Sequence, residues 1–326
     1  MRRPQALPTL QCVFIEIMNS GKRPLGALLL LCLLWAVSAV RAELMPTLAP
    51  AGETALPPFA RQALLYLAMA AVAAAWSFVR RKEPRSPISW AAARSGLGVS
   101  CGLLIFPVVA GRLGGGEISS YARTALMTLV PVFAIVFQPY LCALANPPAR
   151  FSLLAALAAL GGACSVFDVG MPTSPGAALG FVLAILAAAG VAAASCRTLE
   201  AAEPIAVPAS VWAAFAFGAA SLLFERRAWP KLGPTTVLDL VLPIAFDLPA
   251  LILLFWLLRR MSPARAAARY VIAPLFALFI GIAADRPQLE LRTILGLILM
   301  AAGAGYLLLA AEPPSLDTPP ASFLPR

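Results

Sequence analysis

"ARTALMTLVPVFAIVFQPYL", residues 122–141, returns late in the chain as "ARAAARYVIAPLFALFIGIAAD", residues 264–285. Pro131 of the first copy matches Pro274 of the second, 143 positions later, and both copies are largely apolar. An echo of this length predicts that a block of sequence has been duplicated. The alternative is chance, because membrane helices rich in small and apolar residues resemble one another by composition.

The composition predicts an all-α membrane protein. Of the 326 residues, 61% are hydrophobic and only 12% are charged, and the mean hydropathy is +0.85. Soluble domains carry about 25% charged residues, and a soluble chain of this length has too little polar surface to wrap so apolar a core. The bilayer is therefore one expected partner of the chain.

Apolar runs separated by turn residues predict ten transmembrane helices. A bilayer core about 30 Å thick needs roughly 20 apolar residues per helix, and Gly, Pro, Asn and Ser crowd the short connections. The predicted spans are residues 25–42, 60–79, 92–111, 120–143, 151–168, 175–195, 207–224, 236–258, 268–284 and 292–311.

The duplicated block is predicted to hold five of these helices. Residues 25–168 form the first repeat and residues 175–311 the second, between a cytoplasmic segment at 1–24 and a proline-rich, disordered tail at 312–326. Because five is an odd number, the two repeats cross the membrane in opposite directions. Inverted repeats of this kind surround a central cavity that opens to either side in turn.

Basic residues predict that both termini lie in the cytoplasm. With that orientation, 16 of the 25 Lys and Arg residues fall on the cytoplasmic side and 9 on the other. Short cytoplasmic loops carry the excess of Lys and Arg in membrane proteins. The loops that contain "RRKEPR" and "RRMSPARAAAR" contribute most to the difference.

The first residues allow two interpretations. A basic start, an apolar run and "VRA" before Glu43 are typical of a cleaved signal peptide. The long basic segment and the repeat symmetry favour a retained helix instead. The sequence leaves open whether translation starts at Met1 or Met18.

Several classes of function lack the residues they need. The chain has no histidine, and its six cysteines stand singly without a C-x-x-C pair, so we predict no metal site and no cofactor. An enzyme would need an acid–base cluster or a nucleophile, and the predicted spans offer only one central carboxylate. The net charge of +10 lies in clusters beside apolar spans, which indicates membrane topology and not nucleic-acid binding.

Four segments carry a resemblance to a known family, and one of them, "GAALGFVLAILAAAGVAAASCRTLE", resembles the start of that family's second repeat. Residues 262–309 resemble the closing helix pair of an EamA-type repeat in the drug/metabolite transporter (DMT) superfamily. "LLLLCLLWAVSAVRAELMP" and "LPPFARQALLYLAMAAVAAAWSFVRRKEP" are similar to the opening two helices of that family. The resemblance implies a secondary transporter of the inner (plasma) membrane, not an enzyme, that exports or exchanges small organic metabolites such as amino acids. A passive channel or a membrane scaffold is the alternative, and a homodimer is left open.

Ionisable groups within the spans are the first candidates for a substrate site. Asp247 is the acid nearest the middle of a predicted span. One interpretation is that it binds a proton or the substrate. The other is that its carboxyl group hydrogen-bonds backbone groups that nearby prolines leave without helical partners. Arg61, at the arginine position of the resembled family, and Arg123 are either anion-binding groups or anchors that reach the interface.

Aromatic and proline residues complete the candidates. Trp35, Tyr121 and Tyr270 either line a cavity for organic substrates or belong to the interfacial aromatic belt. Pro131 and Pro274 are predicted hinges or kinks, because proline interrupts helix hydrogen bonding at equivalent places in the two copies.

Overall fold

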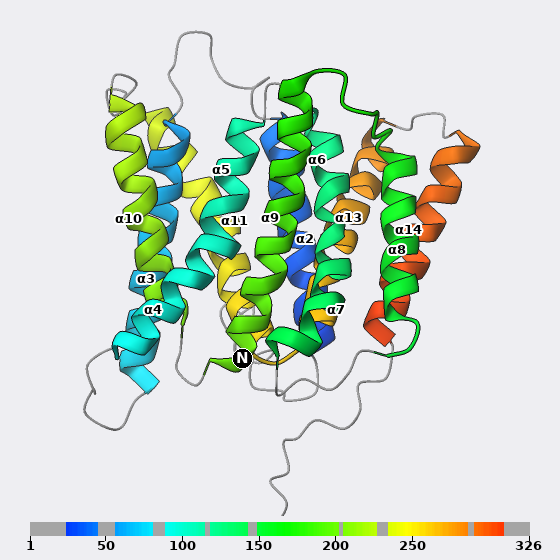
Figure 1. The fold of residues 1–326 in the computed structure, drawn as a ribbon. Helices are drawn as coiled ribbons and strands as arrows, with labels where there is room; N and C mark the ends of the chain where they lie inside the picture. Colours follow the sequence, from blue (N-terminus) through cyan, green and yellow to red (C-terminus); the bar gives the residue numbers. More distant parts are fainter. Residues whose placement is uncertain are drawn as a thin grey trace, which may run out of the picture.

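The computed structural model describes residues 24–44, 56–80, 89–114, 118–142, 149–201, 205–226, 234–285 and 290–309. Within these ranges the regular structure is helical and contains no strand (Figure 1). The predicted segment 1–24, apart from Pro24, and the predicted tail 312–326 lie outside the described residues. The helices are α2 (Pro24–Leu44), α3 (Pro58–Arg80), α4 (Trp90–Val99), the π-helix η2 (Ser100–Ile105), α5 (Phe106–Leu113), α6 (Ser120–Met127), α7 (Leu129–Leu141), α8 (Ser152–Val166), α9 (Pro175–Glu200), α10 (Ala206–Phe224), α11 (Pro234–Leu258), α12 (Pro263–Ala267), α13 (Arg269–Asp285) and α14 (Leu291–Leu309).

Seven helical segments within the described residues are long and apolar enough to cross a membrane. They are Pro58–Trp76, Trp90–Leu113, Ser120–Leu141, Pro175–Leu199, Ala206–Phe224, Pro263–Ala283 and Leu291–Leu309. Three further apolar stretches, Pro24–Val40, Ser152–Val166 and Ile244–Leu258, are shorter. The chain is therefore an all-helical protein with the apolar helices of a multi-pass membrane protein.

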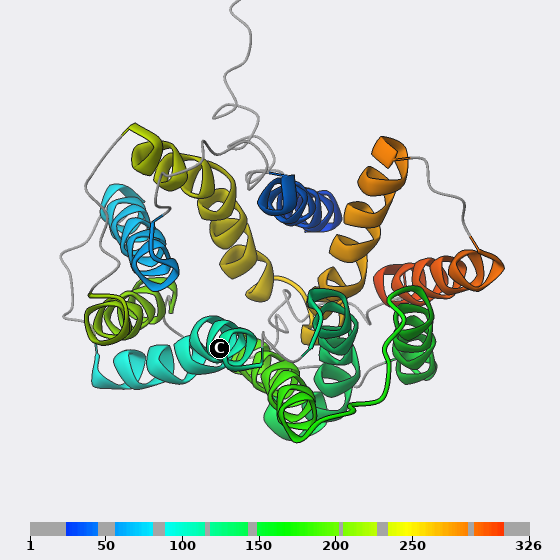
Figure 2. The same cartoon turned by 90° about the horizontal axis from the view of Figure 1, so that it is seen from above.

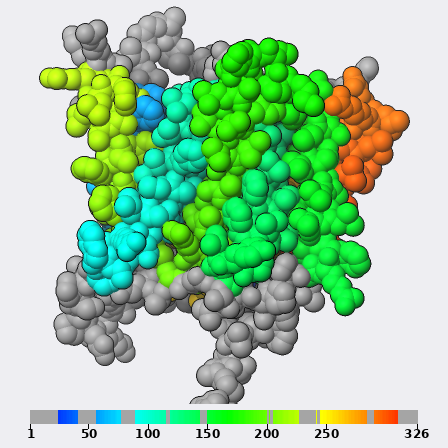
Figure 3. Space-filling model, in the orientation of Figure 1, coloured from blue at the N-terminus to red at the C-terminus, as the bar shows by residue number. Residues whose placement is uncertain are grey.

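The outer surface agrees with a bilayer environment. Large apolar side chains stand exposed on many helices, among them Leu154 on α8, Phe215 on α10 and Ile298 on α14. Soluble monomers rarely expose continuous apolar surface on this scale. Figure 3 shows one face of the molecule, to which α10, α5, α9 and α8 all contribute.

A π-helix interrupts the segment that runs from α4 through α5. Pro107, at the start of α5, has no N–H, and the widened turns of η2 precede it, with the Phe106 N–H bonded to the Cys101 carbonyl. A Cβ at Gly102 of η2 would lie 2.6 Å from the Gly190 carbonyl oxygen of α9. The absence of a side chain at Gly102 thus allows η2 to approach α9 closely.

The two echoed stretches begin alike and are both interrupted. Ser119 caps α6 and Ser262 caps α12, each by accepting a hydrogen bond from the N–H three residues on. The first stretch breaks at Thr128, between α6 and α7, and Pro131 follows the break without an N–H for the Met127 carbonyl.

The second stretch breaks at a different place relative to its proline. Its break, at Ala268, separates α12 from α13, and the Ala268 N–H bonds to the Arg265 carbonyl at 3.1 Å. Pro274 lies further on, inside α13. The break at Ala268 therefore comes before the turn of α13 in which Pro274, which has no N–H, leaves a backbone carbonyl without its helical hydrogen bond.

Helices distant in sequence form the main packing pairs. α8 packs along α14 at one side of the bundle, and α3 packs along α10 at the opposite side (Figures 1 and 2). Between them, α7 contacts α9, and α13 contacts α2. α2 and α11 also touch each other.

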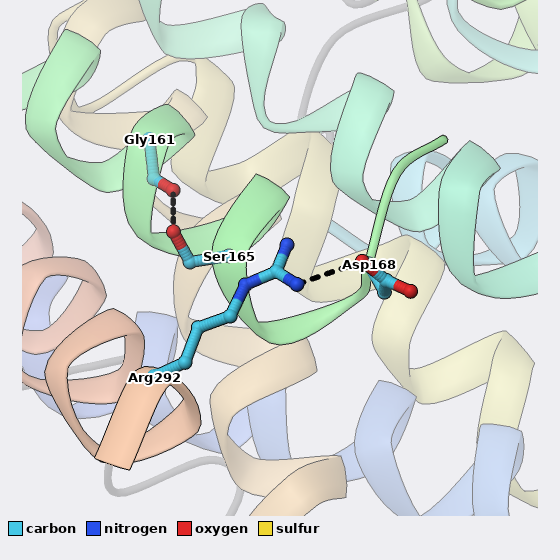
Figure 4. A network of polar contacts seen from close by, with 4 residues as sticks. All are labelled: Gly161, Ser165, Asp168 and Arg292. Atoms are coloured by element: carbon cyan, nitrogen blue, oxygen red, sulfur yellow. Dashed lines mark hydrogen bonds and ion pairs between the residues drawn. The ribbon is translucent and has the colours of Figure 1, made fainter. Parts of the chain in front are cut away.

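The α8–α14 pair depends on glycine at the contact. A Cβ at Gly162 would lie 2.5 Å from the Gly296 carbonyl oxygen, and a Cβ at Gly303 would overlap the Ala155 carbonyl oxygen. Small residues allow membrane helices to approach until their backbones touch. Where the chain leaves α8, Asp168 forms an exposed ion pair of 2.9 Å with Arg292 of α14 (Figure 4), which adds little energy in contact with water.

Glu225 ties the end of α10 to the start of α3. Its two carboxylate oxygens accept hydrogen bonds from the N–H groups of Phe59 and Ala60, at 2.9 and 3.1 Å. These N–H groups belong to the first turn of α3, which has no intrahelical partners for them, and the helix dipole favours a negative charge there. The carboxylate thus replaces a local N-cap.

We expect Glu225→Gln to lower the free energy of unfolding by about 0.5 to 2 kcal/mol, the usual range for loss of a cap. Glutamine keeps one acceptor but removes the charge and the second acceptor. A melting curve of the purified protein in detergent measures the effect. Asp168→Asn is the matched control, since its ion pair is exposed, and it should leave the melting temperature unchanged. Equal shifts for both variants would contradict the capping role.

Candidate functional site

The structure brings three of the predicted site residues together inside the bundle. The rings of Trp35 on α2 and Tyr270 on α13 lie 6.0 Å apart. Asp247 on α11 is connected to this pair through Ser38, on the same helix as Trp35, and through Tyr66, which interacts with both Asp247 and Tyr270. We call the set Trp35, Ser38, Tyr66, Asp247, Arg269 and Tyr270 the central polar cluster.

Asp247 lies close to the midpoint of α11 and faces α2. The Ser38 hydroxyl donates a hydrogen bond of 2.7 Å to an oxygen of the Asp247 carboxylate. Tyr66, on α3, interacts electrostatically with both Asp247 and Tyr270. The acid therefore lies beside polar groups of two other helices, α2 and α3, within a bundle of apolar helices where an uncompensated charge is costly.

Arg269 is the cationic member of the cluster and, among the residues that the structure describes, the largest fully buried side chain, with 1% of its surface exposed. It is the first residue of α13, directly after the break at Ala268. Its guanidinium carbon lies 4.8 Å from the centre of the Tyr270 ring and 5.8 Å from that of Trp35. Both contacts are cation–π interactions, which stabilise a buried cation.

Tyr66 forms the wall of the cluster toward α10. Its ring stacks on Phe217 of α10 with 5.6 Å between ring centres, and the ring of Phe59 also stacks on Phe217, at 6.1 Å. Tyr66 and Phe217 are both buried. This aromatic stack connects the cluster to the α3–α10 pair.

The other predicted substrate residues lie elsewhere. Arg123 packs against α5, where its Nη1 atom lies 3.0 Å from the place a Cβ at Gly111 would occupy. Tyr121 is exposed and stacks on Phe167 at 6.2 Å. Arg61 is half-buried near the start of α3. These three residues therefore make their contacts outside the set that we call the central polar cluster.

A groove of about 310 Å³ lies between α2 and α13, the helices that carry Trp35 and Tyr270 of the central polar cluster. Apolar side chains line this groove: Leu29, Leu30, Leu33, Phe276, Phe279 and Ile280. Within the described ranges, no group of three Cys, Asp or Glu side chains could hold a metal ion.

Comparison with solved structures shows a shared fold. One crystal structure, described only as "Crystal structure of protein", superposes with a TM-score of 0.66 over 88% of this chain and 99% of its own length, at 21% sequence identity. No protein-family model and no curated protein matches the chain. The likeness therefore bears on the arrangement of the helices and not on an activity.

Proposed function

We propose that the chain is a secondary transporter that moves small organic molecules by alternating access, and that it resembles EamA-type carriers of the DMT superfamily in this. The observation that carries the proposal is the central polar cluster. Asp247 and Arg269 place opposite charges inside a bundle of apolar helices. Ionisable residues within a membrane bundle are costly and usually serve a substrate or ion pathway.

The helix pairs support two inverted repeats of five spans each. In that arrangement α2, α3, α4–α5, α6–α7 and α8 correspond in order to α9, α10, α11, α12–α13 and α14. Two corresponding helices then meet each other in the α3–α10 and α8–α14 pairs, as they do across a two-fold axis. The α7–α9 contact corresponds to the α13–α2 contact. A pseudo-two-fold axis would generate this pattern of pairs.

The proposal includes ten crossings and an orientation. The three shorter apolar helices would cross along with the seven longer ones, with both termini on the cytoplasmic side of the inner membrane. The charge distribution of 16 basic residues against 9 supports this orientation.

Cysteine labelling tests the orientation. Thr173 and Arg150 are both exposed, at opposite ends of α8. In a background without native cysteines, we expect Thr173→Cys to react with an impermeant maleimide added outside intact cells, and Arg150→Cys to react only after the membrane is opened. The reverse pattern at both positions would contradict the orientation.

Counterflow distinguishes a carrier from a passive channel or a scaffold. Proteoliposomes are preloaded with one unlabelled metabolite at a time and given a trace of the same metabolite in labelled form. A carrier exchanges the two, so the label accumulates transiently above its equilibrium level. A channel lets the label equilibrate without overshoot, and a scaffold gives no uptake; either result across a panel of amino acids and organic acids would contradict the proposal.

A further inference from the structure

Arg269 is held in one orientation but is not fully hydrogen-bonded. Its Nη1 atom donates to the Ala266 carbonyl at 2.9 Å, and the aromatic rings of Trp35 and Tyr270 lie against the guanidinium. Nothing among the described residues accepts a hydrogen bond from its Nε or Nη2 atom, although both atoms are buried. Buried donors without partners are rare in folded proteins and need an explanation.

The two unpartnered nitrogens have a specific geometry. The N–H of Nε and one N–H of Nη2 lie on the same edge of the planar guanidinium and point the same way. Two parallel donors on one edge match the two oxygens of a single carboxylate, which is the strongest geometry of an arginine–anion contact. The free edge of Arg269 is therefore a fork for a planar anion.

We infer that Arg269 binds the carboxylate of the transported molecule, an inference that rests on the proposed carrier function. The surroundings favour an organic monoanion. Trp35, Cys32 and Tyr270 next to Arg269 present apolar and aromatic surface to the body of the molecule. Asp247 in the same cluster opposes a second negative charge, and so disfavours phosphate.

Binding measurements on the purified full-length protein in detergent test the inference. The probes are benzoate, phenylacetate and 4-methylpentanoate, each compared with its primary amide, which has nearly the same shape but no charge. Inorganic phosphate is the third arm. We expect the carboxylates to raise the melting temperature, by an increment that grows with the logarithm of their concentration above the dissociation constant, and the amides and phosphate to leave it unchanged.

Substitutions assign the effect to Arg269. Arg269→Gln should weaken carboxylate binding by at least about tenfold, and Arg269→Lys should also weaken it, since lysine keeps the charge but has no fork. Arg269→Met replaces a partly unpaired buried cation by an apolar side chain of similar length, so the ligand-free melting temperature should rise while the carboxylate effect disappears. Arg292→Gln is the matched control, because Arg292 is exposed on α14, and it should bind as the parent does.

Three outcomes of the measurements on carboxylates and variants would overturn the inference. They are equal binding of carboxylates and amides by the parent, undiminished carboxylate binding by Arg269→Gln, and failure of both Arg269→Gln and Arg269→Met to fold, which would make Arg269 a structural residue. A shift with phosphate alone would mean an inorganic-anion site and would also overturn it.

Counterflow separates this inference from the carrier function. Carboxylate binding without counterflow of any bound carboxylate would contradict the carrier and leave the Arg269 site standing. Counterflow of neutral solutes that Arg269→Gln does not alter would support the carrier and contradict the carboxylate site.

Discussion

Asp247→Asn is expected to leave the protein folded and to abolish the dependence of its transport on pH. Asparagine keeps the size of the side chain and an oxygen that accepts the hydrogen bond from Ser38, but it cannot gain or lose a proton. We expect uptake driven by a pH gradient to fall by about tenfold or more. A tenfold loss of rate corresponds to ~1.4 kcal/mol, which is smaller than the roughly 2.5 to 3.5 kcal/mol that placing a charge at the bilayer centre costs. The measurement is uptake into proteoliposomes between pH 5.5 and 8.

Ser38→Ala is the control for Asp247→Asn. It removes the 2.7 Å hydrogen bond to Asp247 and keeps the carboxylate, so the transport rate can change while the dependence on pH remains. Asp247→Glu should restore part of that dependence. Parental rate and an unchanged pH profile in Asp247→Asn would show that Asp247 is structural and that protons are not coupled through it.

The second large effect is expected where α8 meets α14. Gly162→Leu should prevent the two helices from packing, because even a single added Cβ would lie 2.5 Å from the Gly296 carbonyl oxygen and 2.8 Å from the Met300 nitrogen. Backbone atoms cannot move aside as a flexible side chain can. Overpacking costs about 1 to 3 kcal/mol for small insertions, so leucine should reduce the yield of monodisperse protein sharply and lower its melting temperature.

Gly161→Leu is the matched control for this contact. Gly161 is the preceding residue of α8, and a Cβ there would meet nothing within 4 Å. Because leucine favours helix over glycine by up to about 1 kcal/mol, the control should be neutral or slightly stabilising. Equal losses in the two variants would mean that α8 tolerates no larger side chain on either face, and the close α8–α14 contact would not explain the effect.

Much of the helical architecture could be predicted from the sequence. Apolar runs and turn residues located the helices to within a few residues, as in α9, which was predicted at 175–195 and continues to Glu200. The serines that precede the two echoed stretches, Ser119 and Ser262, are both N-caps. Periodicity could not show the breaks at Thr128 and Ala268 or the π-helix η2, because they depend on local hydrogen bonding around prolines and on packing against other helices.

The candidate site was predictable in part. Trp35, Asp247 and Tyr270 stood out as polar or aromatic residues within or beside apolar spans. Ser38 and Tyr66 were missed because single residues of these types are common in membrane helices, and only the fold shows which of them face one another.

Arg269 was missed for a different reason. Its position in "RRMSPARAAARY" suggested a charge in a cytoplasmic loop. The signal that could have revealed it is its place four residues after Arg265 and directly before the apolar run of α13. The candidate span Pro263–Ala283 begins before Arg269, so this residue lies inside the apolar segment and not in the loop that precedes it.

The most direct test of the account uses a cysteine that the chain already has. The Cys32 thiol is buried and lies 4.0 Å from the Arg269 carbonyl oxygen, so it reports on the central polar cluster. A variant that keeps Cys32 and carries alanine at the other five cysteines is reconstituted and treated with a small, impermeant methanethiosulfonate reagent from one side at a time. We predict that Cys32 reacts from either side, and that an inward or an outward gradient of a counterflow substrate shifts its reactivity toward opposite sides. Reactivity from one side only, unchanged by the gradient, would contradict alternating access.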